Sequence, residues 1–419
     1  MNRRAEEQGK MGEERLVDST PPLPVSSTPR LPLSRTYSPW QRPLPPECDV
    51  AVVGGGVMGA ATAYWLRQLD PSLRLALVEA ETMAFGASGR NAGFLLLGSH
   101  VDYATAVEAV GRERARRLWR FTRENAVLLR DLGGEEAFEL QRTGSLLAAG
   151  DEAEAARLHR SADLLREDGV EAVYLDAAAA NARANAEHFR GALVVPEGGM
   201  LHPAKLVRHL AAGSGAALLE GARVTALAPG SGGVRLVSEA GVLEAPRAVL
   251  CLNAFLPRLV PELAGYVRPV RAQMLATAPV APFLDRPVYS HEGYFYVRQR
   301  PDGRVLLGGA RNLHEADEVG YDDATTEALQ SDLEAYLHRH FPASGAPVVE
   351  RRWSGTMGFS PDGRPVVGNV PGVPGAVFAC GFTGHGLSYG VRFGLLLAHL
   401  ALGQDDEARD LFAVERLAG

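Results

Sequence analysis

The sequence predicts an α/β fold with a further α+β part, and three observations lead to this prediction. An apolar run, Val50–Val53, is followed by three glycines and then by a small-residue segment of helical composition. A second apolar run, Leu73–Glu79, follows that segment and completes a βαβ unit. From Gly221 onward, short strand-like runs alternate with glycine turns. This order is typical of a parallel sheet near the start of the chain with further strands beyond it.

Composition and turn positions also predict the later elements and a tail. Helical segments are expected at residues 102–132, 151–190, 203–212 and 324–341. Strands are expected at residues 143–150, within 221–252 and within 267–309, where turn residues separate short apolar runs. Residues 1–46 are rich in proline and serine, which predicts a disordered tail before the folded part.

The overall composition is that of a globular protein with no affinity for nucleic acid. The chain has 419 residues, 46% of them apolar and 22% charged, so more than one domain is expected. The net charge of −7 argues against a nucleic-acid partner. The one basic run, Gly111–Arg123, is interpreted as a solvated helix face rather than a nucleic-acid patch.

The cysteines and the apolar runs indicate a reducing compartment and no membrane span. The three cysteines, Cys48, Cys251 and Cys380, lie far apart, and this argues against a disulfide framework or a zinc site. No metal site is expected. No apolar run reaches the ~18 residues that a spanning helix needs. The N-terminus has no apolar stretch of the kind found in secretory signals, so a cytoplasmic location is expected.

The glycine-rich turn carries the first functional prediction. Gly54, Gly56 and Gly59 form a G-x-G-x-x-G pattern between the first strand and the first helix. The first glycine permits a tight turn, the second lets the backbone approach a pyrophosphate, and the third lets the helix pack against the strand. The positive end of the helix then faces the phosphates. This context predicts a dinucleotide site.

An acidic residue narrows the choice of dinucleotide. Glu79 ends the second strand, about twenty residues after Gly59, where a carboxylate accepts hydrogen bonds from ribose hydroxyls. An acid at this position disfavours the 2′-phosphate of NADP. The βαβ unit itself leaves NAD and FAD open.

Three further motifs resemble one enzyme family. They are FGASGRNAGFL (Phe85–Leu95), WSGTMGFSPDGRPVVGNV (Trp353–Val370) and ACGFTGHGLSYGVRFGLLLAHLALG (Ala379–Gly403). Together with the glycine turn they resemble the FAD-dependent oxidoreductases that include D-amino acid oxidase, glycine oxidase and sarcosine oxidase. The chain is most similar to gamma-glutamylputrescine oxidase-like enzymes within that family. The resemblance runs from about Asp49 to the C-terminus and favours FAD over NAD.

The resemblance also implies how the fold is divided. It implies a Rossmann-like FAD-binding domain of the glutathione-reductase type and a discontinuous substrate domain with an antiparallel sheet. The FAD-binding domain is expected at residues 47–100, 196–262 and 350–419. The substrate domain is expected at residues 101–195 and 263–349.

The family's cofactor contacts carry over to matching positions of this sequence. The resemblance places residues of five segments on FAD: the glycine turn, the end of the second strand, the S-G-x-N-A-G motif, the start of the strand after Gly221 and the C-terminal motifs. These are Gly54, Gly56, Val57, Met58, Gly59, Glu79, Ala80, Ser88, Gly89, Arg90, Asn91, Gly93, Val224, Asp362, Gly384, His385 and Gly386. The helix that begins near Gly386 directs its positive end at charge that develops on the reduced flavin.

Catalytic candidates come from the predicted substrate sheet and from the G-H-G motif. In GYFYVRQR, a period of two puts Tyr294, Tyr296 and Arg298 on one face, which lines a substrate pocket or is an ordinary aromatic sheet surface. Further candidates are Arg311, His385 and, less directly, His291.

The sequence departs from the family's pattern at positions that carry known roles. Gly355 stands where sarcosine oxidases have the cysteine that links flavin, so non-covalent FAD is expected. Met357 stands where glycine oxidase has its carboxylate-binding arginine. Leu306 replaces the lysine that promotes reaction with oxygen, so slow reoxidation by oxygen is expected. The lysine that follows G-H-G in sarcosine oxidases is also missing, since Leu387 and Ser388 come next.

The resemblance implies oxidation of an amine. A hydride passes from the carbon next to nitrogen to the flavin, and the imine product is hydrolysed. The expected partners are a small amine and oxygen or another electron acceptor. Two alternatives stay open at this point: a hydroxy-acid or polyol dehydrogenase on the same fold, and a non-catalytic scaffold that holds flavin.

Overall fold

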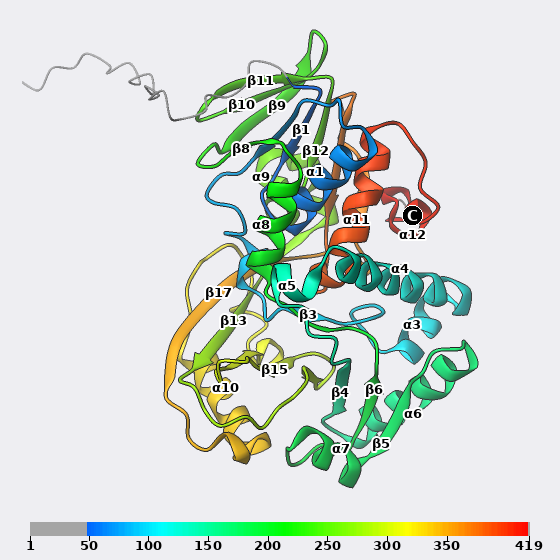
Figure 1. The fold of residues 1–419 in the computed structure, drawn as a ribbon, viewed down its shortest axis with the longest axis vertical. Helices are drawn as coiled ribbons and strands as arrows, with labels where there is room; N and C mark the ends of the chain where they lie inside the picture. The colour runs from blue at the N-terminus through cyan, green and yellow to red at the C-terminus, as the bar shows by residue number, and fades with distance from the viewer. Residues whose placement is uncertain (1–47, 418–419) are drawn as a thin grey trace, which may run out of the picture. The chain divides into compact units, whose positions relative to one another are not determined.

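The computed structural model describes residues 48–417, which are built around two large β-sheets (Figure 1). The predicted tail, residues 1–46, lies outside the described residues. No helix within residues 48–417 combines the length and the apolar composition needed to cross a membrane. The two-sheet α/β architecture predicted from the sequence is confirmed.

The first sheet is six-stranded and mostly parallel. Its order is β18-β19-β12-β1-β2-β8, with only β18 antiparallel to its neighbour. Every residue of β1 and β2 is buried, because layers cover both faces of a parallel sheet. The strands are β1 (Val50–Val53), β2 (Leu75–Val78), β8 (Ala217–Leu219), β12 (Arg247–Leu250), β18 (Val366–Asn369) and β19 (Ala376–Cys380).

Helices cover one face of this sheet, and a small antiparallel sheet covers the other. Val50 and Val52 pack with α1 (Val57–Leu69), α8 (Pro203–Gly213) and α11 (Gly386–Ala401) in one apolar cluster, and Figure 1 shows α1 beside α11. Ala51 and Val53 pack on the opposite side. That side is closed by β9 (Val224–Gly230), β10 (Gly233–Ser238) and β11 (Gly241–Ala245).

The second sheet is eight-stranded, with the order β17-β13-β16-β15-β14-β4-β6-β5. All its pairings are antiparallel except that of β14 with β4. β17 pairs with β13 along its length, so this sheet extends past residue 349, where the predicted substrate domain ends. The strands are β4 (Ser145–Ala149), β5 (Val173–Asp176), β6 (Gly191–Val195), β13 (Arg268–Thr277), β14 (Val288–Ser290), β15 (Phe295–Gln299), β16 (Val305–Gly309) and β17 (Val349–Phe359).

The two faces of the eight-stranded sheet differ in burial. Phe295, Val297 and Leu307 are buried in a cluster with α10 (Glu327–His340), which covers that face. On the other face Tyr296 and Leu306 are only half-buried. The face that carries Tyr296 therefore has no covering helix within residues 48–417, and it is directed toward the first sheet.

The remaining described elements connect the two sheets or extend them. The helices are α2 (Ala87–Arg90), α3 (Tyr103–Val110), α4 (Arg112–Asp131), α5 (Gly134–Phe138), α6 (Glu152–Glu167), α7 (Ala177–Ala184), α9 (Leu256–Leu259) and α12 (Arg409–Phe412). The strands β3 (Phe94–Leu95) and β7 (Gly199–Met200) pair with each other. Short 3-10 turns complete the chain, and one of them, η3 (Arg311–Leu313), follows β16.

Two predicted helical segments differ from the structure. Residues 102–132 form two helices rather than one, because Gly111 takes a φ of 81° between α3 and α4. A continuous helix over residues 151–190 was wrong at β5, where the β-prone residues Val173 and Tyr174 pair with β6. Asp176 then starts α7, since its side chain accepts a hydrogen bond from the N–H of Ala179.

Candidate functional site

The glycine turn leaves no room for side chains at two of its positions. Gly54 has a φ of +111°, and a Cβ there would lie 2.5 Å from the carbonyl oxygen of Cys251. A Cβ on Gly59 would lie 1.9 Å from the carbonyl oxygen of Gly54. The turn, the start of α1 and the end of β12 are therefore packed backbone against backbone, as the sequence pattern predicts.

The first turn of α1 presents unpaired donors. The N–H groups of Gly56, Met58 and Gly59 form no hydrogen bond with any residue between 48 and 417. The N–H of Val57 donates to Ser88 Oγ over 2.9 Å, which brings the S-G-x-N-A-G motif against this helix end. A helix N-terminus with free N–H groups attracts an anion such as a pyrophosphate.

Glu79 joins the glycine turn to the strand that follows. Its Oε2 accepts a hydrogen bond from the N–H of Gly55 over 2.6 Å, and its Oε1 accepts one from the N–H of Glu81 over 2.9 Å. Further lone pairs of this half-buried carboxylate stay available for ribose hydroxyls. Ala80 continues the same turn, and Val224 starts β9 close by, since the N–H of Ala222 donates to the Glu79 carbonyl over 2.8 Å.

Replacing Glu79 with alanine is expected to weaken FAD binding about tenfold to a hundredfold, because both the ribose acceptor and the brace on Gly55 are lost. Titration of apoprotein with FAD, followed by quenching of flavin fluorescence, measures this. Glu81→Ala is the control, since the side chain of Glu81 makes only an exposed ion pair with Arg223 within residues 48–417. Equal loss in both variants, or none in Glu79→Ala, would contradict the ribose role.

The S-G-x-N-A-G segment is braced by its own side chains and by the second sheet. Asn91 donates to the carbonyls of Ala87 and Ser88 and accepts a hydrogen bond from the N–H of Gly93. Gly93 has a φ of +77°, and a Cβ there would clash with the Leu201 carbonyl. Gly89 is equally close to the carbonyl of Ala84. The segment is held in one shape beside α1.

Arg90 is used differently from the prediction that its charge lies along the cofactor. Its guanidinium donates to Asp323 over 2.6 Å and to the carbonyl of Ser354 over 2.9 Å. Its own carbonyl accepts a hydrogen bond from Trp353 Nε1 over 2.8 Å. The side chain of Arg90 therefore joins the segment to β17, and its cofactor role stays a prediction.

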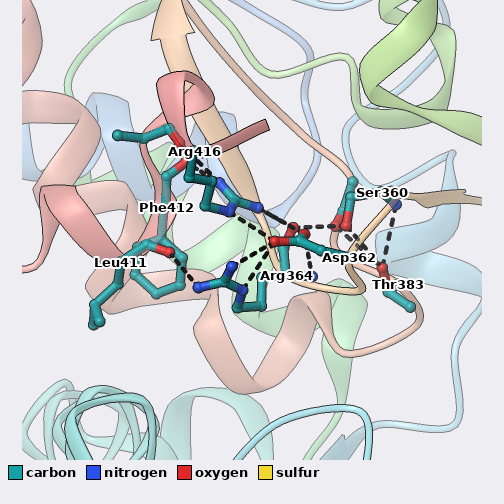
Figure 2. Close-up of polar contacts among 9 residues, drawn as sticks. Ser360, Asp362, Arg364, Thr383, Leu411, Phe412 and Arg416 are labelled. Atoms are coloured by element: carbon teal, nitrogen blue, oxygen red, sulfur yellow. Dashed lines mark hydrogen bonds and ion pairs between the residues drawn. The ribbon is translucent and has the colours of Figure 1, made fainter. Parts of the chain in front are cut away.

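Asp362 lies in the turn between β17 and β18, and two arginines hold its carboxylate (Figure 2). Arg364 donates over 2.6 Å, and Arg416, near the C-terminus, donates to both carboxylate oxygens over 2.9 Å. Burial alone would raise the pKa of Asp362, but the hydrogen bonds and charges of the arginines prevail and lower it to about 2. The carboxylate fixes the turn, and the contact of Asp362 with the cofactor stays a prediction.

The G-H-G motif lies where the predictions put it, at the N-terminus of α11. Gly384 takes a φ of +78°, His385 precedes the helix and Gly386 begins it. Burial, together with the charge of His100, lowers the pKa of His385 to about 4, so the imidazole is neutral at pH 7. Its ring meets the ring of Tyr289 edge-on, with centroids 5.7 Å apart. The motif therefore faces the second sheet.

The predicted aromatic face of β15 is turned toward the S-G-x-N-A-G segment. The rings of Tyr296 and Phe94 meet edge-on, with centroids 6.2 Å apart. The guanidinium of Arg311 lies over the ring of Tyr294, 5.1 Å from its centroid. His291 does not join them, because it packs against Tyr336 and His340 of α10 on the other side of the sheet.

Arg298 makes a contact that the sequence did not reveal. Its Nη1 donates to the carbonyls of Ala92 and Leu201 over 3.1 and 2.9 Å, and its Nε has no partner among residues 48–417. Burial lowers its pKa to about 10. Arg298 therefore holds the flavin-side segment against the sheet, and its candidate catalytic role is untested by these contacts.

Other contributors were missed for want of a local signal. Cys251 closes the glycine turn with its carbonyl, and the buried Nδ1 of His100 has no partner in the described part of the chain. Gly390 and Gly394 let α11 cross α1 closely, since a Cβ on Gly394 would lie 2.4 Å from that of Ala61. The spacing of four between these glycines was a usable signal for close helix packing.

Together these features define a dinucleotide-binding oxidoreductase in which a second sheet covers the cofactor end of the first. The family model described as FAD dependent oxidoreductase matches residues 49–400, so the chain belongs to that family and the resemblance is confirmed. The residues fit FAD, because the glycine turn leaves no room for side chains at Gly54 and Gly59. The first turn of α1 also has N–H groups without a partner among residues 48–417, and these can bind a pyrophosphate.

Curated relatives cover most of this chain. It is 28% identical over 377 residues to a probable oxidoreductase, OrdL, of Rhizobium meliloti, covering 86% of this chain and 84% of that protein. It is 27% identical over 380 residues to gamma-glutamylputrescine oxidoreductase of Escherichia coli, covering 87% of this chain and 86% of that protein.

A solved structure shows the same fold. Glycine oxidase of Geobacillus kaustophilus superposes with a TM-score of 0.74 at 24% identity, covering 88% of this chain and 98% of that chain. At this identity the likeness concerns the fold alone.

Proposed function

We propose that the chain uses FAD to oxidise an amine at the carbon next to nitrogen. The observation that carries the proposal is the half-buried aromatic face of the second sheet, which lies opposite the two motifs expected to hold the flavin. Tyr296 meets Phe94 of one motif, and Tyr289 meets His385 of the other. The relatives include a gamma-glutamylputrescine oxidoreductase and a glycine oxidase, which supports a C–N bond as the site of oxidation.

When bound, FAD accepts the hydride and its electron pair, and the imine that is left reacts with water to give a carbonyl compound and a released amine or ammonia. The protein contributes orientation and a dry environment. Burial raises the pKa of Tyr289, and it raises that of Tyr296 to about 12, so both phenols keep their protons. The neutral imidazole of His385 adds no charge that would repel a cationic amine. A poorly hydrated pocket favours the neutral amine, whose lone pair assists hydride loss.

The face offers no clamp for the carboxylate of a short amino acid at the position that glycine oxidase uses. Met357 takes that place on β17, and its sulfur lies 3.6 Å from where a Cβ on Gly384 would be. Since a carboxylate without a cation or several donors is strongly penalised, glycine, sarcosine and D-alanine are proposed to bind poorly.

FAD is proposed to be held without a covalent bond. Gly355 faces Arg90 at the position of the linking cysteine. Burial raises the pKa of the thiols of Cys48, Cys251 and Cys380 to about 12, which leaves them unreactive. Acid precipitation is therefore expected to release all the yellow flavin into the supernatant. Flavin fluorescence that stays on the denatured chain would contradict this.

The electron acceptor and the location are also proposals. Leu306 pairs with Arg298 across β15 and β16, and it supplies no cation for a reaction with oxygen. His291 lies on the far face of the sheet, so of His291 and Arg311 only Arg311 brings a cation to the aromatic face. Because Arg311 does not stand at the position of the lysine, slow reaction with oxygen is proposed. Three free cysteines support a cytoplasmic location.

Turnover with an artificial electron acceptor tests the proposed activity. A panel of polyamines, gamma-glutamyl amines, N-alkyl glycines and D-amino acids is compared with hydroxy acids of matched length, and the carbonyl product is trapped and identified. A carbonyl product from amines is expected. Products from hydroxy acids alone would replace the proposal with a dehydrogenase of alcohols.

A further inference from the structure

Arg311 lies near the site, and no carboxylate within residues 48–417 pairs with its guanidinium. It begins η3, directly after Ala310, whose φ of 57° turns the chain at the end of β16. The side chain of Arg311 forms no hydrogen bond or ion pair with any residue between 48 and 417, although its carbonyl accepts a hydrogen bond from the N–H of His314 over 3.0 Å. By contrast, Arg90 pairs with Asp323 over 2.6 Å.

Two aromatic rings hold the guanidinium of Arg311. Its central carbon lies 5.1 Å from the ring centroid of Tyr294 and 4.9 Å from that of Phe359. Contacts of this kind stabilise a cation and restrict its orientation without neutralising its charge. A half-buried cation held in this way retains its donors for an anion that the protein does not supply.

Its position is on the face that the proposed function assigns to the substrate. The charge of Arg311 lowers the pKa of both Tyr289 and Tyr296 against the larger opposing effect of burial, so it lies near both phenols. Tyr289 in turn meets His385 at the start of α11. Arg311 is thus a neighbour of the residues that flank the expected flavin ring.

The spacing along β17 compares the position of Arg311 with that of the carboxylate-binding arginine of glycine oxidase, which corresponds to Met357. Met357 and Phe359 are two residues apart, so their side chains share a face and are separated by roughly 7 Å along the strand. Arg311 lies over the ring of Phe359, whereas the family's arginine would stand at Met357. A carboxylate that pairs with Arg311 is therefore held at a different point of the face from one that an arginine at position 357 would hold.

We propose that Arg311 determines substrate specificity by pairing with a carboxylate that lies several bonds away from the oxidised carbon of the amine. This inference rests on the proposed function and names the class of its substrate: a flexible amine with a distal carboxylate. The planar fork of the guanidinium binds such a group through two parallel hydrogen bonds. The rings of Tyr294 and Phe359 pack against the aliphatic part of the same molecule.

The test uses the holoenzyme and two readouts. Glutarate, which cannot be oxidised, is titrated while the visible spectrum of the oxidised flavin is recorded. Wild type is expected to bind it, and Arg311→Met is expected to bind it about tenfold to a hundredfold more weakly, with partial recovery in Arg311→Lys. The second readout is the kinetics of gamma-glutamylputrescine and putrescine, which differ by the glutamyl group. KM for the acid-bearing amine should rise in Arg311→Met with little change in kcat, whereas KM for putrescine, which has no acid to pair with Arg311, should not rise.

Arg258→Met is the matched control. Arg258 also lies over two aromatic rings, 3.9 Å from the centroid of Tyr321 and 5.6 Å from that of Phe255, but in the α9 region. It should leave glutarate binding and both kinetic constants unchanged.

Equal glutarate binding by wild type and Arg311→Met, or no binding by wild type, would overturn the proposal. Tighter binding of inorganic phosphate than of glutarate would replace the carboxylate with a phosphate. Failure of every amine to reduce the flavin would refute the proposed function while the glutarate titration still decided the role of Arg311.

Discussion

Replacing Gly59 with alanine is expected to abolish retention of FAD. A Cβ at this position would lie 1.9 Å from the carbonyl oxygen of Gly54, so α1 must move away from the glycine turn. This contact is between backbone atoms, and overpacking there typically costs about 1–3 kcal/mol or more. The displaced helix also withdraws the free N–H groups of its first turn from the pyrophosphate. The ratio of flavin to protein absorbance after gel filtration measures the loss.

Gly86→Ala is the matched control for this variant. Gly86 precedes α2 in the same region, its φ of −71° suits any residue, and no atom lies within 4 Å of a Cβ placed there. It should keep a full complement of FAD. Normal flavin content in Gly59→Ala would mean that the glycine turn does not hold the dinucleotide.

Replacing Asp362 with alanine is expected to lower the free energy of unfolding by about 3 kcal/mol, because Arg364 and Arg416 are then left half-buried without their carboxylate. The same change frees the C-terminal segment from the turn between β17 and β18 (Figure 2). Chemical unfolding followed by tryptophan fluorescence measures the difference. Asp163→Ala removes an exposed pair with Arg166 and should cost less than about 1 kcal/mol. Similar losses of unfolding free energy in the two variants would show that the ion pairs of Asp362 stabilise the fold no more than an exposed pair does.

The same carboxylate gives stability a defined dependence on pH. The pKa of Asp362 falls from 3.8 to about 2 on folding, so its contribution is fully present above pH 4. As the pH falls through 2 the native carboxylate is protonated and about 2 kcal/mol of stability is lost. Asp362→Asn should therefore show a flatter stability curve than wild type between about pH 4 and pH 2. Parallel curves would contradict the ion-pair account.

The sequence predicted best what depends on neighbouring residues. The glycine turn, Glu79 and the two strands around them form one local unit, so spacing alone predicted the βαβ unit that the structure has. The partial exposure of Tyr296 between the buried residues Phe295 and Val297 followed from the period of a strand. The β5 strand was missed because its short β-prone run lies within an alanine-rich stretch, where composition favours helix.

Contacts between distant segments could not be predicted in this way. Arg90 meets Asp323, and Arg298 meets the carbonyl of Ala92, across more than two hundred residues in each case. Both arginines were assigned to ligands because a single sequence gives no register between sheets. That no carboxylate within residues 48–417 pairs with the guanidinium of Arg311 is likewise visible only in the structure.

The most direct test of the account is anaerobic reduction of the bound flavin. The holoenzyme is mixed, without oxygen, with gamma-glutamylputrescine, sarcosine and a hydroxy acid of matched length, and the flavin absorbance is followed. The account predicts rapid bleaching by the amine with a distal carboxylate, slow bleaching by sarcosine and none by the hydroxy acid. Bleaching by the hydroxy acid alone would contradict amine oxidation, and a preference of more than about a hundredfold for sarcosine would contradict the assignment of Arg311.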